Sequence, residues 1–86
     1  MTDLERQLVI TMEECGELVQ ACSKIIRTGA CSGSRLDNLI EEAGDVYCMI
    51  SILSNRGLFT QEDLEKQKAK RIEKLKKYEC SRVAGQ

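Results

Sequence analysis

Two short acidic segments with nearly the same sequence carry the residues best suited to chemistry. Residues 13–17 read Glu-Glu-Cys-Gly-Glu, and residues 41–45 read Glu-Glu-Ala-Gly-Asp. Each segment places two acids three positions apart, and on a helix such acids lie on the same face. Four carboxylates that meet between two helices repel one another unless a cation lies among them. The four acids are Glu14, Glu17, Glu42 and Asp45.

A hard divalent cation is the simplest way to hold four such acids together. Mg²⁺ prefers oxygen ligands, keeps several waters and commonly binds substrate phosphates as well, and Mn²⁺ is an alternative. The predicted chemistry is therefore phosphoryl chemistry at a metal bound by carboxylates. A single segment of this kind is more often a solvated helix face, because glutamate is a good helix former. The presence of two matched segments favours the metal site.

The first acidic segment lies in a predicted amphipathic helix over residues 3–27. The apolar residues of this helix recur at steps of three and four, which is the helical period. We expect this apolar stripe to face the core, and Glu14 and Glu17 to lie on a flank beside it. The stripe comprises Leu4, Leu8, Met12, Cys15, Val19, Cys22 and Ile26.

The second acidic segment lies in a predicted helix over residues 35–55. Glu42 and Asp45 fall in the arc of this helix that carries its apolar residues, so we expect both acids to face the core. Ser34 is predicted to cap the start of the helix, with Asp37 as its capping-box partner. The apolar members of the arc are Val46, Met49 and Leu53.

A third helix is predicted from Thr60, with Asp63 as its capping partner, to about Tyr78, and Gly57 ends the helix before it. The pattern predicts an all-α fold, an antiparallel bundle of about three helices in a single domain over residues 1–86. The chain has only three aromatic residues among its 86 residues to thicken a core. We therefore expect a homodimer or homotetramer that completes the bundle.

Composition argues against several classes of function. With 13 basic and 14 acidic residues, the chain has too little net charge to attract a nucleic-acid polymer or a charged membrane surface. No apolar run is long enough to span a bilayer. The chain has no histidine, and its five cysteines show no CxxC spacing, which argues against zinc. Three cysteines lie in apolar helical patterns and are predicted to be reduced core residues. The polar start predicts no signal peptide and a cytoplasmic protein.

The acidic pattern resembles the signature of the MazG-like family, which belongs with dimeric dUTPases to the all-α NTP pyrophosphatases. Glu13-Glu14-x-x-Glu17 is followed, after a gap of 24 residues, by Glu42-x-x-Asp45. The resemblance covers nearly the whole chain and implies a helical bundle with its active site at or near a subunit interface. It implies hydrolysis of a nucleoside triphosphate, ribo or deoxy, to the monophosphate and pyrophosphate. It also implies that Glu14, Glu17, Glu42 and Asp45 are the metal ligands.

Basic residues on two helices are candidate ligands of the triphosphate. Lys68 and Arg71 share the apolar side of the third helix, so we expect them to project inward. Lys24 follows Glu17 by two turns on the same flank, and Lys74 lies in a basic run that resembles the last helix of the family. The alternative for each of them is a lysine or arginine stem lying along apolar surface with its charge in water.

The expected mechanism is metal-assisted attack of water on the α-phosphorus, with pyrophosphate as the leaving group. Glu13 or Glu17 accepts the proton of that water, and the sequence does not distinguish them. Glu13 alternatively supports the metal ligands without touching substrate. The expected role is housecleaning of the nucleotide pool or control of a signalling nucleotide.

A non-catalytic module is the competing interpretation of the same residues. In that case the chain is a dimerising helical interaction module or a nucleotide-binding module, and its acids pair with the basic third helix. A ferritin-like di-iron protein needs Glu-x-x-His on its helices, and a chain without histidine lacks that motif.

Overall fold

The computed structural model describes residues 1–82, with side chains to residue 78. The chain forms three helices, α1 (Asp3–Thr28), α2 (Gly33–Asn55) and α3 (Gln61–Arg82), and there is no strand within the described residues. The predicted all-α class is therefore confirmed, and the predicted helices differ from the observed ones by only a few residues at their ends.

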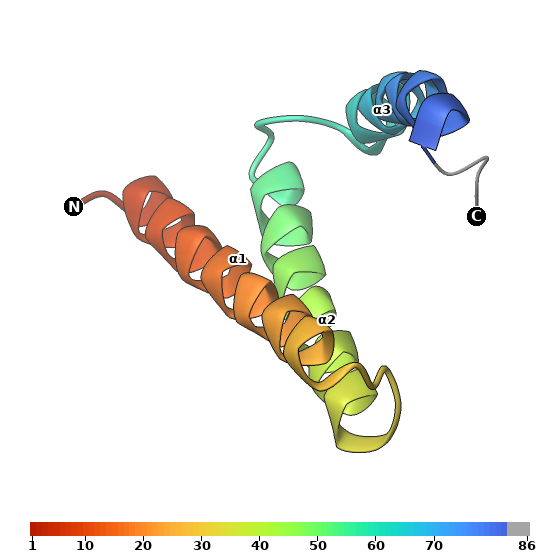
Figure 1. The fold of residues 1–86 in the computed structure, drawn as a ribbon. Coiled ribbons are helices and arrows are strands. Elements are labelled where there is room, and N and C mark those ends of the chain that lie inside the picture. The colour runs from red at the N-terminus through yellow and green to blue at the C-terminus, as the bar shows by residue number, and fades with distance from the viewer. Residues whose placement is uncertain (83–86) are drawn as a thin grey trace. The chain divides into compact units, whose positions relative to one another are not determined.

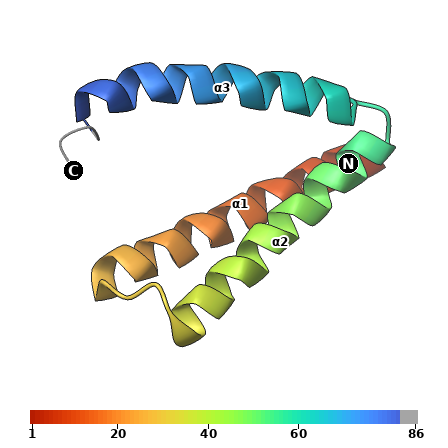
Figure 2. The ribbon, with the colours of Figure 1, turned by 90° about the vertical axis from the view of Figure 1, so that its right-hand side faces the viewer.

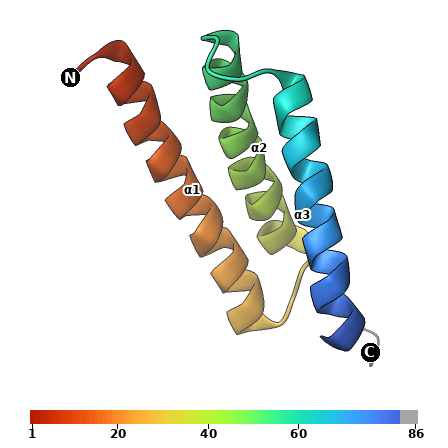
Figure 3. The same ribbon diagram turned by 90° about the horizontal axis from the view of Figure 1, so that it is seen from above.

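The helices α1 and α2 lie side by side as an antiparallel hairpin, joined by a short turn (Figures 1 and 2). Contacts divide the chain into two compact units, Met1–Arg56 and Gly57–Gln86. The first unit is the hairpin, and the second contains α3, which is a single continuous helix (Figure 3). Among the described residues the buried apolar side chains are Ala21, Met49 and Leu53, all in the hairpin.

Local hydrogen bonds explain where the helices begin. The Thr2 hydroxyl accepts from the Glu5 backbone N–H at 3.0 Å, and the Thr2 N–H donates to the Glu5 carboxylate at 2.7 Å. Thr60 and Asp63 form the same reciprocal pair at 3.1 and 2.9 Å. Each pair satisfies two backbone N–H donors at a helix start. The predicted Thr60–Asp63 cap is confirmed, and the cap at Thr2 is an addition to the predicted ones.

Glycines in the left-handed region end two helices. Gly29 has φ +69° and donates its N–H to the Ile25 carbonyl at 2.8 Å, which ends α1. Gly57 has φ +96° just beyond α2, as predicted. The predicted Ser34 cap is wrong, because α2 already begins at Gly33 and Ser34 lies inside its first turn. Ser32 occupies the capping position but makes no side-chain hydrogen bond there.

The face of α1 that packs on α2 is not the apolar stripe predicted from the sequence. Of that stripe only Leu4 is half-buried, and its other six residues are exposed. The contact face lies one residue earlier in register along the helix and includes polar side chains. Gln7, for example, accepts a hydrogen bond from the Arg56 guanidinium at 3.1 Å. Its buried and half-buried members along the α2 contact are Leu4, Gln7, Thr11, Glu14, Leu18, Ala21 and Ile25.

The prediction that cysteines lie in the core is also wrong. Cys15, Cys22, Cys31 and Cys48 are free thiols, and all four are exposed. They carry no part of the core of the hairpin. The fifth cysteine, Cys80, lies outside the residues whose side chains the structure describes.

Candidate metal centre

The hairpin brings together three of the four acids that the sequence singled out. One carboxylate oxygen each from Glu14, Glu42 and Asp45 lies within 4.8 Å of the others. Glu14 comes from α1, and Glu42 and Asp45 come from α2. Glu14 and Glu42 are half-buried between the helices, whereas Asp45 is exposed at the edge. The cluster therefore opens to solvent on one side.

The electrostatics of the cluster show a shortage of positive charge. Desolvation raises the pKa of Glu14, and the charges of Asp45, Glu17 and Glu13 raise it further, as does a hydrogen bond with Asp45. Desolvation is also the main cause that raises the pKa of Glu42, followed by the charges of Glu17, Asp45, Glu41 and Glu14. Every charged neighbour that acts on these two groups is an anion. A donor set of carboxylate oxygens under such repulsion fits a hard divalent cation.

Glu17 and Glu13 lie beside the cluster. Glu17 is exposed, and its charge acts on both Glu14 and Glu42. Glu13 is exposed and its charge acts on Glu14. Neither belongs to the group of three acids within 4.8 Å. Glu17 as a fourth metal ligand, and Glu13 or Glu17 as the proton acceptor, stay predictions.

Two positions differ from what the sequence predicted. Asp45 was predicted to face the core, but it is exposed, because the arc of α2 that meets α1 is centred on Glu42, Val46 and Met49. Glu14 was predicted to lie on a flank of α1, but it lies in the face that meets α2 and is half-buried. Glu14 is thus more buried than predicted and Asp45 less buried, but the two carboxylates still lie close together.

The glycine of each acidic segment has open space around it. A Cβ built on Gly16 or Gly44 meets no atom within 4 Å. Among the described residues, then, no close backbone approach explains either glycine, although a glycine inside a helix costs about 1 kcal/mol relative to alanine. Both glycines therefore border open space.

A small basic cleft lies at the turn end of the hairpin. It is lined by Lys24, Arg27 and Thr28 of α1 and by Arg35 of α2. The sequence pattern indicated Lys24 as a phosphate ligand but gave no indication of Arg27 or Arg35. The signal for them was the short turn, which places the end of α1 beside the start of α2. Lys24 itself is half-buried, and its role stays a prediction.

The other predicted phosphate ligands lie on α3, in the second unit. Lys68, Arg71 and Lys74 are all exposed on their own helix, and the expectation that Lys68 and Arg71 project toward the site stays a prediction. The half-buried apolar residues of the helix are Leu64 and Leu75. Ion pairs on α3 join Lys66 to Glu62 at 3.5 Å and Lys76 to Glu73 at 3.4 Å. Among the described residues, no ion pair involves the acids of the cluster.

The raised pKa values of Glu14 and Glu42 predict how the stability of the metal-free protein depends on pH. The folded state holds these protons more tightly than the unfolded state, so stability falls as pH rises from the ordinary glutamate pKa through the raised pKa. We expect a higher melting temperature at pH 5 than at pH 7 in EDTA, measured by circular dichroism. Glu42→Gln should weaken this dependence and Glu65→Gln should not. An undiminished dependence in Glu42→Gln would contradict the explanation.

Comparison with known proteins agrees with the geometry. Within the part of the chain that the structure describes, no helix has the length and apolar character needed to cross a membrane. A search of curated proteins and a search of solved structures return no match to the chain. The family model described as the MazG nucleotide pyrophosphohydrolase domain matches residues 3–79, which include both acidic segments and almost all of the three helices. The chain belongs to the MazG nucleotide pyrophosphohydrolase family.

Proposed function

We propose that this chain is a Mg²⁺-dependent nucleoside triphosphate pyrophosphohydrolase, built as one MazG-like domain over residues 1–86. It converts a ribo- or deoxyribonucleoside triphosphate to the monophosphate and pyrophosphate. The observation that carries the proposal is the meeting of Glu14, Glu42 and Asp45 within 4.8 Å, in surroundings that raise the pKa of Glu14 and Glu42. Membership of the family supports the same chemistry.

The residues that would hold the metal are Glu14, Glu42 and Asp45, with Glu17 as a fourth. Mn²⁺ fits the same oxygen donors. A divalent cation bound there supplies positive charge to phosphate oxygens and lowers the pKa of a bound water. Glu13 and Glu17 are exposed beside the cluster, so either can accept a proton from a water that approaches the α-phosphorus from the open side.

The basic cleft can hold the phosphates that leave as pyrophosphate. Lys24 follows Glu17 by seven residues, which places it about 10 Å further along α1. Arg27 and Arg35 line the same cleft. Their guanidinium groups match phosphate oxygens in geometry and stay charged at any physiological pH. A triphosphate that extends from the acids toward the turn thus meets cations where negative charge accumulates. Lys68, Arg71 and Lys74 on α3 are proposed as further phosphate ligands.

The biological setting of the proposal follows from the substrate. A cytoplasmic enzyme of this kind removes unwanted nucleotides from the pool or limits a signalling nucleotide. We propose that it works as a homodimer or homotetramer and acts on free nucleotides rather than on a nucleic-acid polymer.

A panel of nucleotides tests the proposed reaction. Each of the common ribo- and deoxyribonucleoside triphosphates is incubated with the full chain and Mg²⁺, and pyrophosphate and inorganic phosphate are measured separately. The proposal expects one or more substrates to give monophosphate and pyrophosphate in equal amounts. Release of inorganic phosphate alone would show a different reaction. Nucleotide binding without any product would favour the non-catalytic module.

Arg35→Gln is expected to weaken substrate binding. A hydrogen bond between charged groups contributes about 1.5–3 kcal/mol, so we expect KM to rise about tenfold or more, with a smaller change in kcat. Steady-state kinetics on the best substrate of the panel measures both. Arg6→Gln is the matched control, because Arg6 pairs with Asp3 at the other end of α1 at 3.3 Å. Equal KM values for the two variants would remove the cleft from the substrate site.

A further inference from the structure

Two isoleucines lie next to the metal centre, on the same side of the hairpin as its exposed acids. Ile10 precedes Glu17 by seven residues on α1, and Ile52 follows Asp45 by seven residues on α2. Seven residues make almost two full turns, so each isoleucine lies on the flank of its acid, about 10 Å along the helix. Ile10 is 38 % exposed and Ile52 is half-buried. Because the helices are antiparallel, both steps lead to the end of the hairpin away from the turn.

The same spacing in the opposite direction reaches polar and basic residues. Lys24 follows Glu17 by seven residues, and Asn38 precedes Asp45 by seven residues. Both are half-buried, and Lys24 lines the basic cleft at the turn. One side of the hairpin therefore presents isoleucines, carboxylates and cations in succession. A nucleoside triphosphate has its nucleoside, α-phosphate and terminal phosphates in the same order.

A hydrogen bond joins the two helices at the end that carries the isoleucines. Nη1 of Arg56 donates to Oε1 of Gln7 at 3.1 Å. Gln7 precedes Glu14 by seven residues, so this pair lies about 10 Å along α1 from the metal centre. No ion pair among the described residues involves Arg56, and the charges that raise the pKa of Glu14 and Glu42 do not include it.

The Arg56–Gln7 pair offers mainly hydrogen-bond donors to a ligand. The carbonyl oxygen of the Gln7 side chain already accepts from Arg56, whereas its NH₂ group is a donor. A guanidinium has five N–H donors and no acceptor, so Arg56 adds donors only. A ligand that meets this pair is therefore favoured if it presents carbonyl oxygens rather than amino groups.

We propose that this end of the hairpin is the nucleoside subsite and that it selects bases with a carbonyl oxygen where adenine and cytosine carry an amino group. Ile10 and Ile52 contact the base, and Arg56 and Gln7 donate to its carbonyl oxygen. The inference rests on the proposed function, which places the α-phosphate at the acids and the terminal phosphates in the basic cleft. The nucleoside then lies on the other side of the acids.

The chemistry of the subsite matches that of a keto base. Apolar side chains cover the faces of a base, and a few polar groups fix its orientation. A guanidinium donates to base carbonyl oxygens and also stacks on a planar ring. The substrate class is therefore the triphosphates of guanine, hypoxanthine, uracil and thymine.

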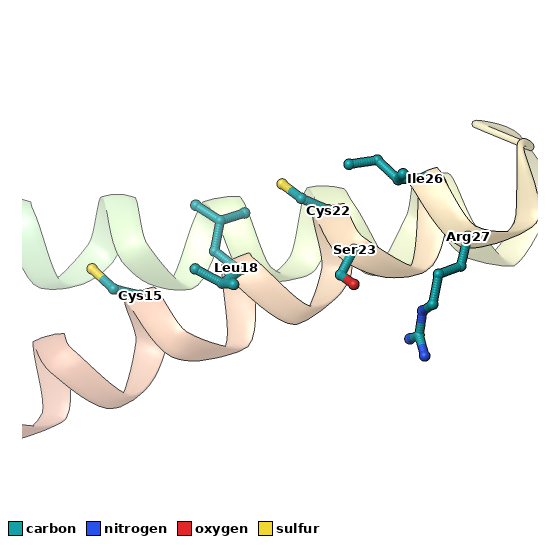
Figure 4. A pocket seen from close by; sticks show the side chains of 7 residues that line it. Cys15, Leu18, Cys22, Ser23, Ile26 and Arg27 are labelled. Atoms are coloured by element: carbon teal, nitrogen blue, oxygen red, sulfur yellow. The ribbon is translucent and has the colours of Figure 1, made fainter.

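A larger apolar groove on α1 lies on the wrong side of the helix for this role. Figure 4 shows Cys15, Cys22 and Ile26 along it. Cys15 precedes Glu17 by two residues, which places the two side chains about 200° apart around the helix. A nucleotide bound through the exposed acids therefore does not reach the groove of the same chain.

Two pairs of nucleotides test the inference on the wild-type protein. Inosine triphosphate (ITP) carries a carbonyl oxygen at the purine C6 where ATP carries an amino group, and UTP differs from CTP in the same way at C4. We expect kcat/KM for pyrophosphate release to be about tenfold or more higher for ITP than for ATP, and for UTP than for CTP, because the amino group leaves the charged donor unpaired. A ratio of one or less in either pair would overturn the inference.

Variants of Arg56 show whether this residue causes the preference. Arg56→Met keeps most of the stem and removes the donors, so we expect the ITP to ATP ratio to fall to about one. Arg56→Lys keeps a charged donor and should keep part of the preference. Arg35→Gln, at the phosphate end, should raise KM for both nucleotides equally and leave the ratio unchanged. A full preference in Arg56→Met would overturn the assignment.

Ile10→Ala tests the apolar contact with the base. We expect KM to rise about fivefold for all four nucleotides, with both ratios unchanged, because the lost contact does not involve the exocyclic group. Val9→Ala is the matched control, since Val9 is also 38 % exposed and is turned by about 100° from Ile10, away from the acids. Equal KM values for the two variants would contradict the contact.

Calorimetric titration separates this inference from the proposed reaction. Release of pyrophosphate from all four nucleotides at equal kcat/KM would support the reaction and overturn the base preference. If no nucleotide gives pyrophosphate, the proposed reaction fails, and the Kd values of ITP and ATP in Mg²⁺ still report the preference. We expect ITP to bind about tenfold more tightly than ATP to wild type and equally tightly to Arg56→Met. Equal Kd values for wild type, or no binding of either nucleotide, would overturn the inference.

Discussion

Replacing Asp45 with asparagine is expected to remove pyrophosphohydrolase activity while leaving the fold intact. Asp45 is exposed at the open edge of the cluster, so its carboxylate can bind a metal ion without contributing to the core. Mutation of residues that only orient metal ligands already lowers metal affinity or activity by about 10- to 100-fold. We therefore expect the loss of a ligand charge to lower kcat/KM by about 100-fold or more.

The stability of the metal-free Asp45→Asn variant separates a metal ligand from a structural acid. The charge of Asp45 raises the pKa of both Glu14 and Glu42, so its removal relieves repulsion in the apo protein. We expect an apo melting temperature equal to or above that of wild type. Asp37→Asn, also exposed and on α2, is the matched control and should keep full activity. A variant that melts much earlier yet hydrolyses at the wild-type rate would show that Asp45 is structural.

Mg²⁺ is expected to stabilise the wild-type protein strongly, and Glu42→Gln should lose most of that gain. A ligand present at 100 times its Kd and bound only to the native state adds about 2.7 kcal/mol. For a domain of this size each kcal/mol raises the melting temperature by about 4–8 °C. Saturating Mg²⁺ or Mn²⁺ should therefore raise it by more than about 10 °C, as measured by circular dichroism.

A neighbouring glutamate gives the control for that experiment. Glu41 is exposed and lies outside the group of three acids within 4.8 Å. Glu41→Gln removes the same charge one position away and should keep the stabilisation by Mg²⁺. Melting curves of wild type that are identical in Mg²⁺ and in EDTA would count against a metal at this site.

The helices and their ends could be predicted because their signals are local. Thr60 and Asp63 form the predicted cap with hydrogen bonds of 2.9 and 3.1 Å, and Gly57 takes the left-handed conformation just beyond α2. Ser34 was misassigned because Ser32, Gly33 and Ser34 offer similar signals within three residues. Only the observed start of α2 at Gly33 decides between them.

The contact face of α1 could not be predicted from periodicity. The helix has two stripes with heptad spacing, and the more apolar one was assigned to the core. The stripe that packs on α2 includes Gln7, Thr11 and Glu14, which reads as a polar flank when the helix is considered alone. Packing against α2, which brings Glu42 beside Glu14, changes that assignment.

The acids were found by sequence because two matched segments repeat one pattern. The basic cleft was missed because Arg27 and Arg35 belong to different helices and have no common motif. They come together only through the turn that reverses the chain. A site formed by tertiary contact between different helices has no characteristic spacing in the sequence.

The most direct test of the account compares pyrophosphate release by wild type with release by variants that differ only in single carboxylates. Glu14→Gln, Glu42→Gln and Asp45→Asn are assayed with Mg²⁺ and the best nucleotide of the panel, beside Glu41→Gln as the control. We predict Mg²⁺-dependent release by wild type and Glu41→Gln, abolished by EDTA, and a loss of about 100-fold or more in each of the other three. Full activity in any of these three variants, or wild-type activity that persists in EDTA, would contradict a metal centre formed by these acids.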